Sequence, residues 1–208
     1  MADYEALAKQ KYSKHSQNYY NSGANDEVSL RTQFSDFDRI KLKYRTFTNP
    51  SMFKDTKTDL LGKQIESPIC VTSTAFQRMG FPEGEVATAR ACNNKRTPFV
   101  LSSWATSSNE EVGEAAPDVQ KIYQIYITKP PVDNLDIWKR VKNSGFCAYA
   151  LTCDTQLLGK RLQDTRYKFS LPPHLRMENF VKYMPKSDES SEVKGQKASG
   201  LAEFVKKC

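Results

Sequence analysis

From residue 67 onward, apolar runs alternate with amphipathic segments. The runs are SPICVTSTA at 67–75, TPFVLSSWA at 97–105, VQKIYQIYI at 119–127 and FCAYALTCD at 146–154. The segments between them, at 82–95, 108–116 and 132–145, have helical character. Near-continuous apolar strands joined by helices of this length are typical of βαβ units and a parallel sheet buried on both faces. The pattern therefore predicts an α/β fold, either a doubly wound sheet or a barrel.

The chain before residue 67 follows a different pattern. A first stretch at 3–26 has aromatic and aliphatic residues near helical spacing, and a second at 27–42 places Leu30, Phe34 and Phe37 at i, i+4 and i+7. Short β-prone pieces with turn residues follow. We expect a helical cap over 1–45 and a hairpin or irregular layer over 46–66.

The alternation stops after Asp154. Residues 155–200 include two adjacent prolines and a tract rich in Ser, Asp, Glu and Lys. Connections of this length are usually functional lids or disordered segments. We expect a long loop or lid over 155–200, and the start of a helix over 201–208, where the chain reads LAEFVKKC.

Composition narrows the classes of partner. The 208 residues carry 31 Lys and Arg against 24 Asp and Glu, a formal charge of +7, but the basic residues are scattered and form no run longer than a pair. Nucleic acid is therefore not an expected partner, whereas an anionic small ligand is compatible with the charge. The five cysteines include no CxxC pair, so neither a disulfide framework nor a metal site is expected.

The chain has no apolar stretch near the ~18 residues of a membrane span, and it begins with neither a signal peptide nor an Arg-rich transit peptide. We therefore expect an intracellular protein without a membrane partner. Nucleotide motifs of the G-x-G-x-x-G and G-K-[ST] types are also missing from the sequence, which sets aside nicotinamide and ATP enzymes.

Small or polar residues end all four apolar runs. They are Ser73-Thr74-Ala75, Ser102-Ser103-Trp104, Gln124-Ile125-Tyr126 and Thr152-Cys153-Asp154. Any one of them also fits a simple turn or cap. Because the carboxyl ends of strands in α/β folds open into one shared mouth, four such ends predict a common binding site.

Six segments carry a resemblance to a known family. They are DYEALAKQKYSKHSQNYYNSGANDE, TSTAFQRMGFPEGEVATARAC, LSSWATSS, QIYITK, LTCDTQLLGKRLQDTRYKF and LPPHLRMENF. In this order they resemble the FMN-dependent 2-hydroxy-acid oxidases, which include glycolate oxidase. The resemblance implies one FMN hydroxy acid dehydrogenase-type domain over 1–208, matching only the family's N-terminal half. It implies an incomplete TIM (β/α)8 barrel, with a helical cap and about four βα units whose strands lie within 67–154.

The resemblance also implies site residues. Contacts to FMN are implied for Ser73, Thr74, Ala75, Ser102, Gln124 and Thr152. Contacts to a small 2-hydroxy acid are implied for Tyr19, Trp104, Tyr126 and Arg161. The first three cofactor residues lie along the flavin ring and the other three bond its polar edge. A guanidinium can bind a carboxylate through two donors, and a phenol stays a neutral donor at working pH. Taken singly, these aromatic and basic residues also fit core packing or a surface charge.

The implied catalytic residues are Tyr126, at the oxygen on the reacting carbon, and Asp154, which in the family pairs with a histidine base. The chain's two histidines, His15 and His174, do not match that base. The function implied is oxidation of (S)-2-hydroxy acids such as glycolate to 2-oxo acids, with O2 giving H2O2. The alternative is a catalytically inactive, truncated form or fragment that associates with full-length relatives.

The implied half barrel leaves a strand edge and apolar surface open. We therefore expect either a family-type homo-oligomer or self-association through that edge. The family resemblance also implies a peroxisomal location, although Lys206-Lys207-Cys208 is not a tripeptide of the Ser-Lys-Leu type.

Overall fold

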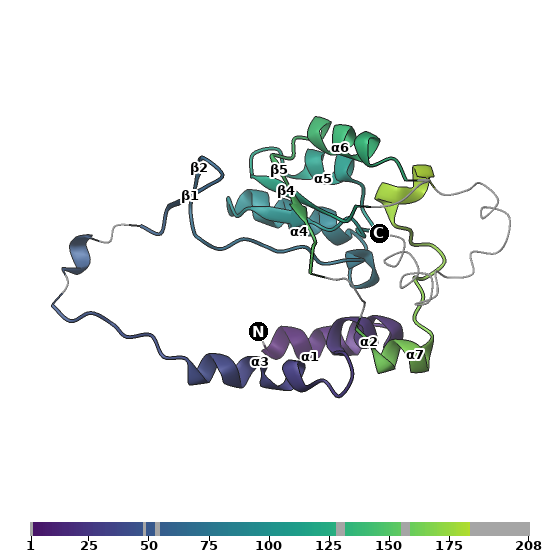
Figure 1. The fold of residues 1–208 in the computed structure, drawn as a ribbon, viewed down its shortest axis with the longest axis horizontal. Coiled ribbons are helices and arrows are strands. Elements are labelled where there is room, and N and C mark those ends of the chain that lie inside the picture. Colours follow the sequence, from purple (N-terminus) through teal and green to yellow (C-terminus); the bar gives the residue numbers. More distant parts are fainter. Residues whose placement is uncertain (1, 48, 53–54, 128–131, 155–158, 184–208) are drawn as a thin grey trace.

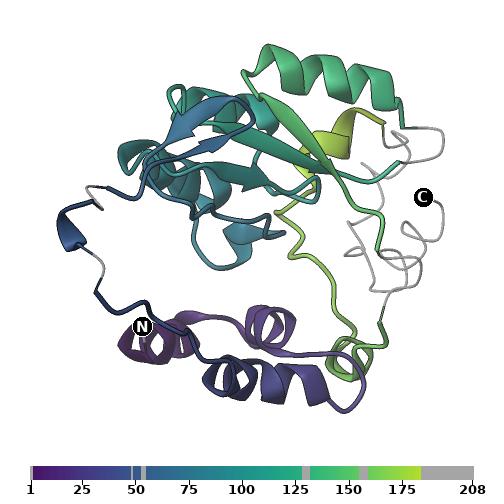
Figure 2. The same cartoon turned by 60° about the vertical axis from the view of Figure 1, so that its left-hand side comes forward.

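A computed structural model describes residues 2–47, 49–52, 55–127, 132–154 and 159–183. Its helical layer consists of α1 (Ala2–Lys11), α2 (Lys14–Asn21), α3 (Val28–Arg39) and α7 (Leu162–Tyr167). Figures 1 and 2 show this layer beside the sheet, with α7 lying against α2. The first predicted helical stretch divides at Ser13, whose side chain caps α2 by accepting from the Ser16 N–H at 3.1 Å.

A long connection leads from α3 to a hairpin. It runs past the 3-10 turn η1 (Pro50–Met52) and reaches β1 (Thr58–Leu60) and β2 (Lys63–Ile65), which pair antiparallel. Leu61 and Gly62 join the two strands, with φ of 50° and 76°. Two central residues with positive φ are typical of the turn whose twist matches paired strands.

The sheet has three parallel strands, β3 (Phe99–Leu101), β4 (Lys121–Ile125) and β5 (Ala148–Leu151), in the order β3-β4-β5. The helices α4 (Gly84–Asn94), α5 (Asn109–Ala115) and α6 (Asn134–Asn143) alternate with these strands along the chain. Two of the helices begin at side-chain caps. Ser108 and Glu111 form a capping box at α5, and Asp133 accepts two N–H groups at α6. The α/β prediction is confirmed by the parallel sheet and by the helices that alternate with its strands.

The first predicted barrel strand, at 67–75, is reduced to a single parallel bridge between Val71 and Phe99. The Val71 N–H donates to the Pro98 carbonyl at 2.9 Å, and the Val100 N–H donates to the Val71 carbonyl at 2.9 Å. Pro68 has no N–H to donate, which limits the pairing. The four predicted strands are thus one bridge followed by three strands in the same order.

Part of the predicted loop over 155–200 lies within the described residues. Its described residues form α7 and the 3-10 segment η3 (Glu178–Tyr183). Four of its apolar side chains are buried in the core: Phe169, Leu171, Met177 and Phe180. Asn179 fastens the segment, because its Oδ1 accepts the Asn109 N–H at 2.9 Å. These side chains anchor the segment in the core, but their spacing follows no helix or strand period, so the sequence pattern did not indicate their burial. The remainder of that prediction, including the helix start at 201–208, lies outside the described residues.

Large apolar side chains are exposed at several places, including β5 and α3. On β5, which pairs only with β4 among the described strands, Tyr149 is 44% and Leu151 51% exposed. On α3, Phe34 and Phe37 are 76% and 82% exposed, so the apolar stripe predicted there faces away from the described core. These surfaces are available for contact with further protein.

Candidate functional site

An aromatic cluster lies at the carboxyl ends of the strands. The Phe76 ring is 5.4 Å from that of Tyr19 on α2 and 6.1 Å from that of Trp104, which follows β3. Trp104 in turn lies 5.4 Å from Tyr126, which follows β4, and Phe169 stacks on Tyr19 at 4.8 Å. The structure thus brings together three of the predicted substrate residues, Tyr19, Trp104 and Tyr126.

The fourth, Arg161, lies against Tyr19. Its guanidinium carbon is 5.0 Å from the centre of the Tyr19 ring, and Nη2 donates to the carbonyl of Tyr19. Nη2 also donates to Ser22 Oγ at 3.0 Å, and Nε is 3.3 Å from Asp164 Oδ2. Arg161 is therefore oriented by α2 on one side and by its own helix α7 on the other.

Burial has the largest effect on the pKa of Tyr19 and on that of Asp164, which both lie beside Arg161. It raises the pKa of Tyr19 to about 12, against the opposing effect of Arg161. It also raises the pKa of the Asp164 carboxyl, again against Arg161. Tyr19 is consequently a neutral phenol at physiological pH, able both to donate and to accept a hydrogen bond.

A polar chain connects the ends of β3, β4 and β5. The Ser103 N–H lies 3.1 Å from Gln124 Oε1, and Ser103 Oγ is 3.3 Å from the same atom. Because a backbone N–H can only donate, the atom facing it is the amide oxygen. Gln124 Nε2 therefore faces Thr152 and donates to its Oγ1 at 2.8 Å. Ser102 Oγ, beside this chain, accepts the Trp104 N–H at 3.1 Å.

The segment Ser73–Ala75 reaches the same end of the sheet. Ser73 and Ala75 are half-buried and Thr74 is exposed. Its end is fastened by Tyr20 on α2, whose hydroxyl donates to the Phe76 carbonyl at 2.8 Å and lies 3.4 Å from that of Ala75. The predicted FMN residues thus come from the ends of the first bridge and all three strands.

A buried carboxylate supports these loops from beneath. Glu85 on α4 is 0% exposed. Its Oε1 accepts the N–H groups of Gln77 and Thr106, both at 2.9 Å. Its Oε2 accepts the hydroxyls of Thr106 and Ser107 at 2.9 and 2.8 Å. Glu85 therefore ties the connection after the first bridge to the loop after β3.

Asp154 and the two histidines are all exposed. Asp154 lies three residues beyond β5, His15 lies on α2, and His174 lies in a turn ahead of η3. The roles of Asp154 and Tyr126 in proton transfer stay predictions.

The residues at the strand ends fit the polar edge of a flavin. A flavin edge has carbonyl oxygens that accept and a ring N–H that donates. Gln124 Nε2 has a second hydrogen, and Thr152 Oγ1 keeps its own hydrogen, with no partner for either among the described residues. The Ser102 hydroxyl can donate as well as accept. This donor set suits FMN, and the described residues include no group of three or more metal ligands.

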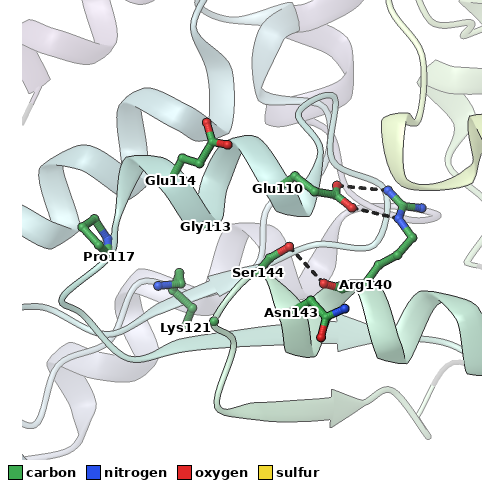
Figure 3. A pocket seen from close by; sticks show the side chains of 9 residues that line it. Glu110, Gly113, Glu114, Pro117, Lys121, Arg140, Asn143 and Ser144 are labelled. Atoms are coloured by element: carbon green, nitrogen blue, oxygen red, sulfur yellow. Dashed lines mark hydrogen bonds and ion pairs between the residues drawn. The ribbon is translucent and has the colours of Figure 1, made fainter.

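A separate cavity of about 550 Å³ is lined by residues of α5, by the end of α6 and by Lys121 at the start of β4 (Figure 3). Arg140 and Glu110 on its wall form two bonds of 2.9 and 3.0 Å. Lys121, whose pKa is lowered by burial, donates to the Ala116 carbonyl and so caps the end of α5. No predicted site residue lines this cavity, and the Glu110–Arg140 pair on its wall holds α5 and α6 together.

Several of these residues escaped the sequence-based predictions. Ser103 is adjacent to a predicted residue in the same polar strand end, which was the available signal. Tyr20 is adjacent to Tyr19, and either tyrosine fits the helical spacing. Glu85 and Phe169 gave no signal, because a glutamate in an amphipathic helix and a phenylalanine in a loop are ordinary residues.

None of the described helices is both long and apolar enough to cross a membrane.

The chain is similar to several characterised proteins. It is 42% identical to 2-Hydroxyacid oxidase 1 of Homo sapiens, over 99% of this chain and 55% of the relative. It is 41% identical to Glycolate oxidase 1 of Zea mays, over 98% of this chain and 53% of the relative. The chain spans about half the length of the curated relatives it matches.

Solved structures share the fold. The structure of mandelate oxidase with (S)-2-phenylpropionate matches with a TM-score of 0.79 and 27% identity, over 90% of this chain and 55% of that one. The flavin-binding domain of baker's yeast flavocytochrome b2 matches with a TM-score of 0.73 and 36% identity, over 81% of this chain and 44% of that one. The family model described as FMN-dependent dehydrogenase matches residues 8–208. FMN is the cofactor of that family, and this chain belongs to it.

Proposed function

We propose that this chain forms part of an FMN-dependent oxidase that converts (S)-2-hydroxy acids such as glycolate to 2-oxo acids, with O2 as the final electron acceptor and H2O2 as its product. One observation carries the proposal. The Ser103–Gln124–Thr152 polar chain and the Tyr19–Arg161 pair lie at the same end of the sheet, with Trp104 and Tyr126 in the same aromatic cluster. A flavin edge and a carboxylate therefore have neighbouring partners.

The residues divide the work by chemistry. FMN, when bound, supplies the acceptor for the hydride equivalent from the hydroxyl-bearing carbon. Gln124 and Thr152 hold the ring edge through their remaining donors. Arg161 attracts the substrate carboxylate, and its contacts with Tyr19 and Ser22 fix its direction. The neutral Tyr19 phenol donates to the same carboxylate.

Proton transfer involves Tyr126 and Asp154 in this proposal. Tyr126 contacts the oxygen at the reacting carbon. The exposed Asp154 carboxylate orients a histidine base, which neither His15 nor His174 matches, and stabilises the charged form of that base. Loss of general acid-base catalysis typically costs about 10² to 10⁴-fold in rate. Binding of FMN and substrate can therefore be measured separately from turnover.

The test is anaerobic. The 208-residue chain is mixed with FMN, freed of unbound flavin and given glycolate while the oxidised flavin absorbance is followed. Retained flavin that loses its absorbance supports the oxidase function. Retained flavin that stays oxidised supports binding without turnover, and absence of retained flavin contradicts the proposal for this chain.

A matched pair of variants sharpens the test. Tyr19→Phe removes one hydroxyl from the proposed carboxylate site, whereas Tyr12→Phe removes a hydroxyl from the same helical layer outside the site. We expect Tyr19→Phe to weaken the effect of glycolate on the bound flavin spectrum and Tyr12→Phe to leave it unchanged. Equal effects of the two variants contradict the proposed role of Tyr19.

A second candidate function, that of an inactive partner for full-length relatives or for further copies of itself, is favoured by the β5 edge. Tyr149 and Leu151 are exposed beside backbone groups that have no neighbouring strand among the described residues. Light scattering after size exclusion tests self-association, and co-purification with a full-length relative tests the mixed complex. A monomer that retains no relative contradicts this candidate.

We also propose a peroxisomal location, which follows from the resemblance to 2-hydroxy-acid oxidases. Microscopy of an N-terminal fluorescent fusion beside a peroxisomal marker tests it. A diffuse signal contradicts the proposal.

A further inference from the structure

Phe76 has an unusual backbone for a buried aromatic residue. Its φ and ψ are 61° and 38°, in the left-handed region, and it is 0% exposed. The other described non-glycine residues with positive φ are exposed or half-buried. For a bulky side chain this conformation costs roughly 1–3 kcal/mol and persists only where surrounding contacts fix it.

The contacts that fix Phe76 come from three directions. Its N–H donates to the Trp104 carbonyl at 3.3 Å, and its carbonyl accepts the Met79 N–H at 2.9 Å. The same carbonyl accepts the Tyr20 hydroxyl at 2.8 Å. The bonds from Met79 and Trp104 arise within the strand-end loops, so Tyr20 alone among these partners reaches Phe76 from the helical layer.

The position of Tyr20 links both parts of the proposed site. It follows Tyr19, the proposed carboxylate donor, and the two rings lie 5.3 Å apart at 78°. Its hydroxyl holds the backbone directly after the segment Ser73–Ala75, which is expected to lie along the flavin. A shift of this backbone therefore moves the flavin-facing groups relative to Tyr19.

We propose that Tyr20 is a positioning residue whose hydroxyl holds the Ala75–Phe76 backbone in its left-handed turn and thereby places the flavin-facing segment. The effect on FMN rests on the proposed function, whereas the effect on the backbone does not. Burial raises the pKa of the Tyr20 phenol, so the donated hydrogen is retained at physiological pH.

Hydrogen exchange of the intact chain tests the backbone effect. Tyr20→Phe removes the hydroxyl and keeps the ring, and a hydrogen bond of this kind corresponds to about a three- to tenfold change in a local opening equilibrium. We expect amide exchange in the peptide covering 72–80 to accelerate by that factor. Tyr12→Phe is the control, since its ring lies 6.0 Å from that of Tyr20 and its hydroxyl bonds no described residue. Unchanged exchange in Tyr20→Phe, or equal acceleration in Tyr12→Phe, overturns the proposal.

FMN binding tests the consequence for the site. We expect Tyr20→Phe to weaken FMN affinity about three- to tenfold. Without the Tyr20 hydrogen bond, the turn must be ordered when FMN binds, and this ordering reduces the free energy of binding. Faster amide exchange with unchanged FMN affinity would contradict the claim that Tyr20 positions the flavin-facing segment for FMN. If the wild-type chain binds no FMN, the proposed function fails, and the exchange experiment still decides whether Tyr20 positions this backbone.

Discussion

Glu85 offers a sharp test of how the strand-end loops are supported. Replacing it with Ala removes the acceptor of two N–H groups, those of Gln77 and Thr106, each 2.9 Å from Oε1. Hydroxyls can rotate to new partners, but these backbone N–H groups cannot. At about 1–3 kcal/mol for each buried unsatisfied group, Glu85→Ala should lower the free energy of unfolding by about 2–6 kcal/mol. Urea unfolding followed by tryptophan fluorescence measures this loss.

Glu85→Gln is the matched control. Its amide oxygen still accepts both N–H groups, and its amide nitrogen can donate to the Thr106 and Ser107 hydroxyls. The bonds lose only their charge assistance, so we expect a loss below about 2 kcal/mol. Equal losses in the two variants would show that the negative charge, and not the set of acceptors, stabilises the loops. A loss below about 1 kcal/mol for Glu85→Ala would refute the reasoning entirely.

Three further predictions concern the site and the strand edge. Burial raises the folded pKa of Tyr19 from 10.0 to about 12, so the stability it contributes is full below pH 10 and is lost as the pH rises toward 12. Alkaline unfolding of wild type and Tyr19→Phe, together with tyrosinate absorbance, measures this, and identical pH profiles contradict it. Thr152→Val removes the acceptor of the Gln124 amide and should weaken FMN affinity about three- to tenfold by calorimetry; unchanged affinity contradicts the edge role. Leu151→Lys places a charge on β5 and should shift any oligomer toward monomer in light scattering, whereas an unchanged oligomer places the contact elsewhere.

The helices α5 and α6 and the later strands were predictable because each has a local cause. Ser108 and Asp133 begin α5 and α6 as side-chain caps, and the apolar runs at 97–105, 119–127 and 146–154 contain β3, β4 and β5. The first strand is different, since pairing depends on neighbours as well as on apolar content. Val71 pairs at one position, and the run around it continues as loop.

The arrangement of the candidate site's residues was predictable in its place at the strand ends and only partly in its contacts. The apolar runs recur at regular intervals and each ends in small or polar residues. This pattern in the sequence placed Gln124 and Thr152 at one edge of the sheet. The Ser103 bond that orients the Gln124 amide depends on the turn after β3. The Tyr20 bond joins residues 56 positions apart. Such contacts arise only when separate elements pack, so no local pattern predicts them.

The two parts of the proposed site differ in what must fold before they exist. The polar edge is formed by neighbouring strand ends that pair within one sheet. The proposed site for the substrate carboxylate joins Arg161 to Tyr19, which are 142 residues apart in the sequence. These residues are held by α7 and α2 in the helical layer. Since elements with fewer buried contacts open at lower free energy than the core, and α1, α3 and α7 bury no residue while α2 buries only Ser16, the helical layer should open before the sheet. The proposed substrate recognition depends on this layer, so it should be more sensitive than the proposed flavin contacts to a partner that contacts the exposed face of α3.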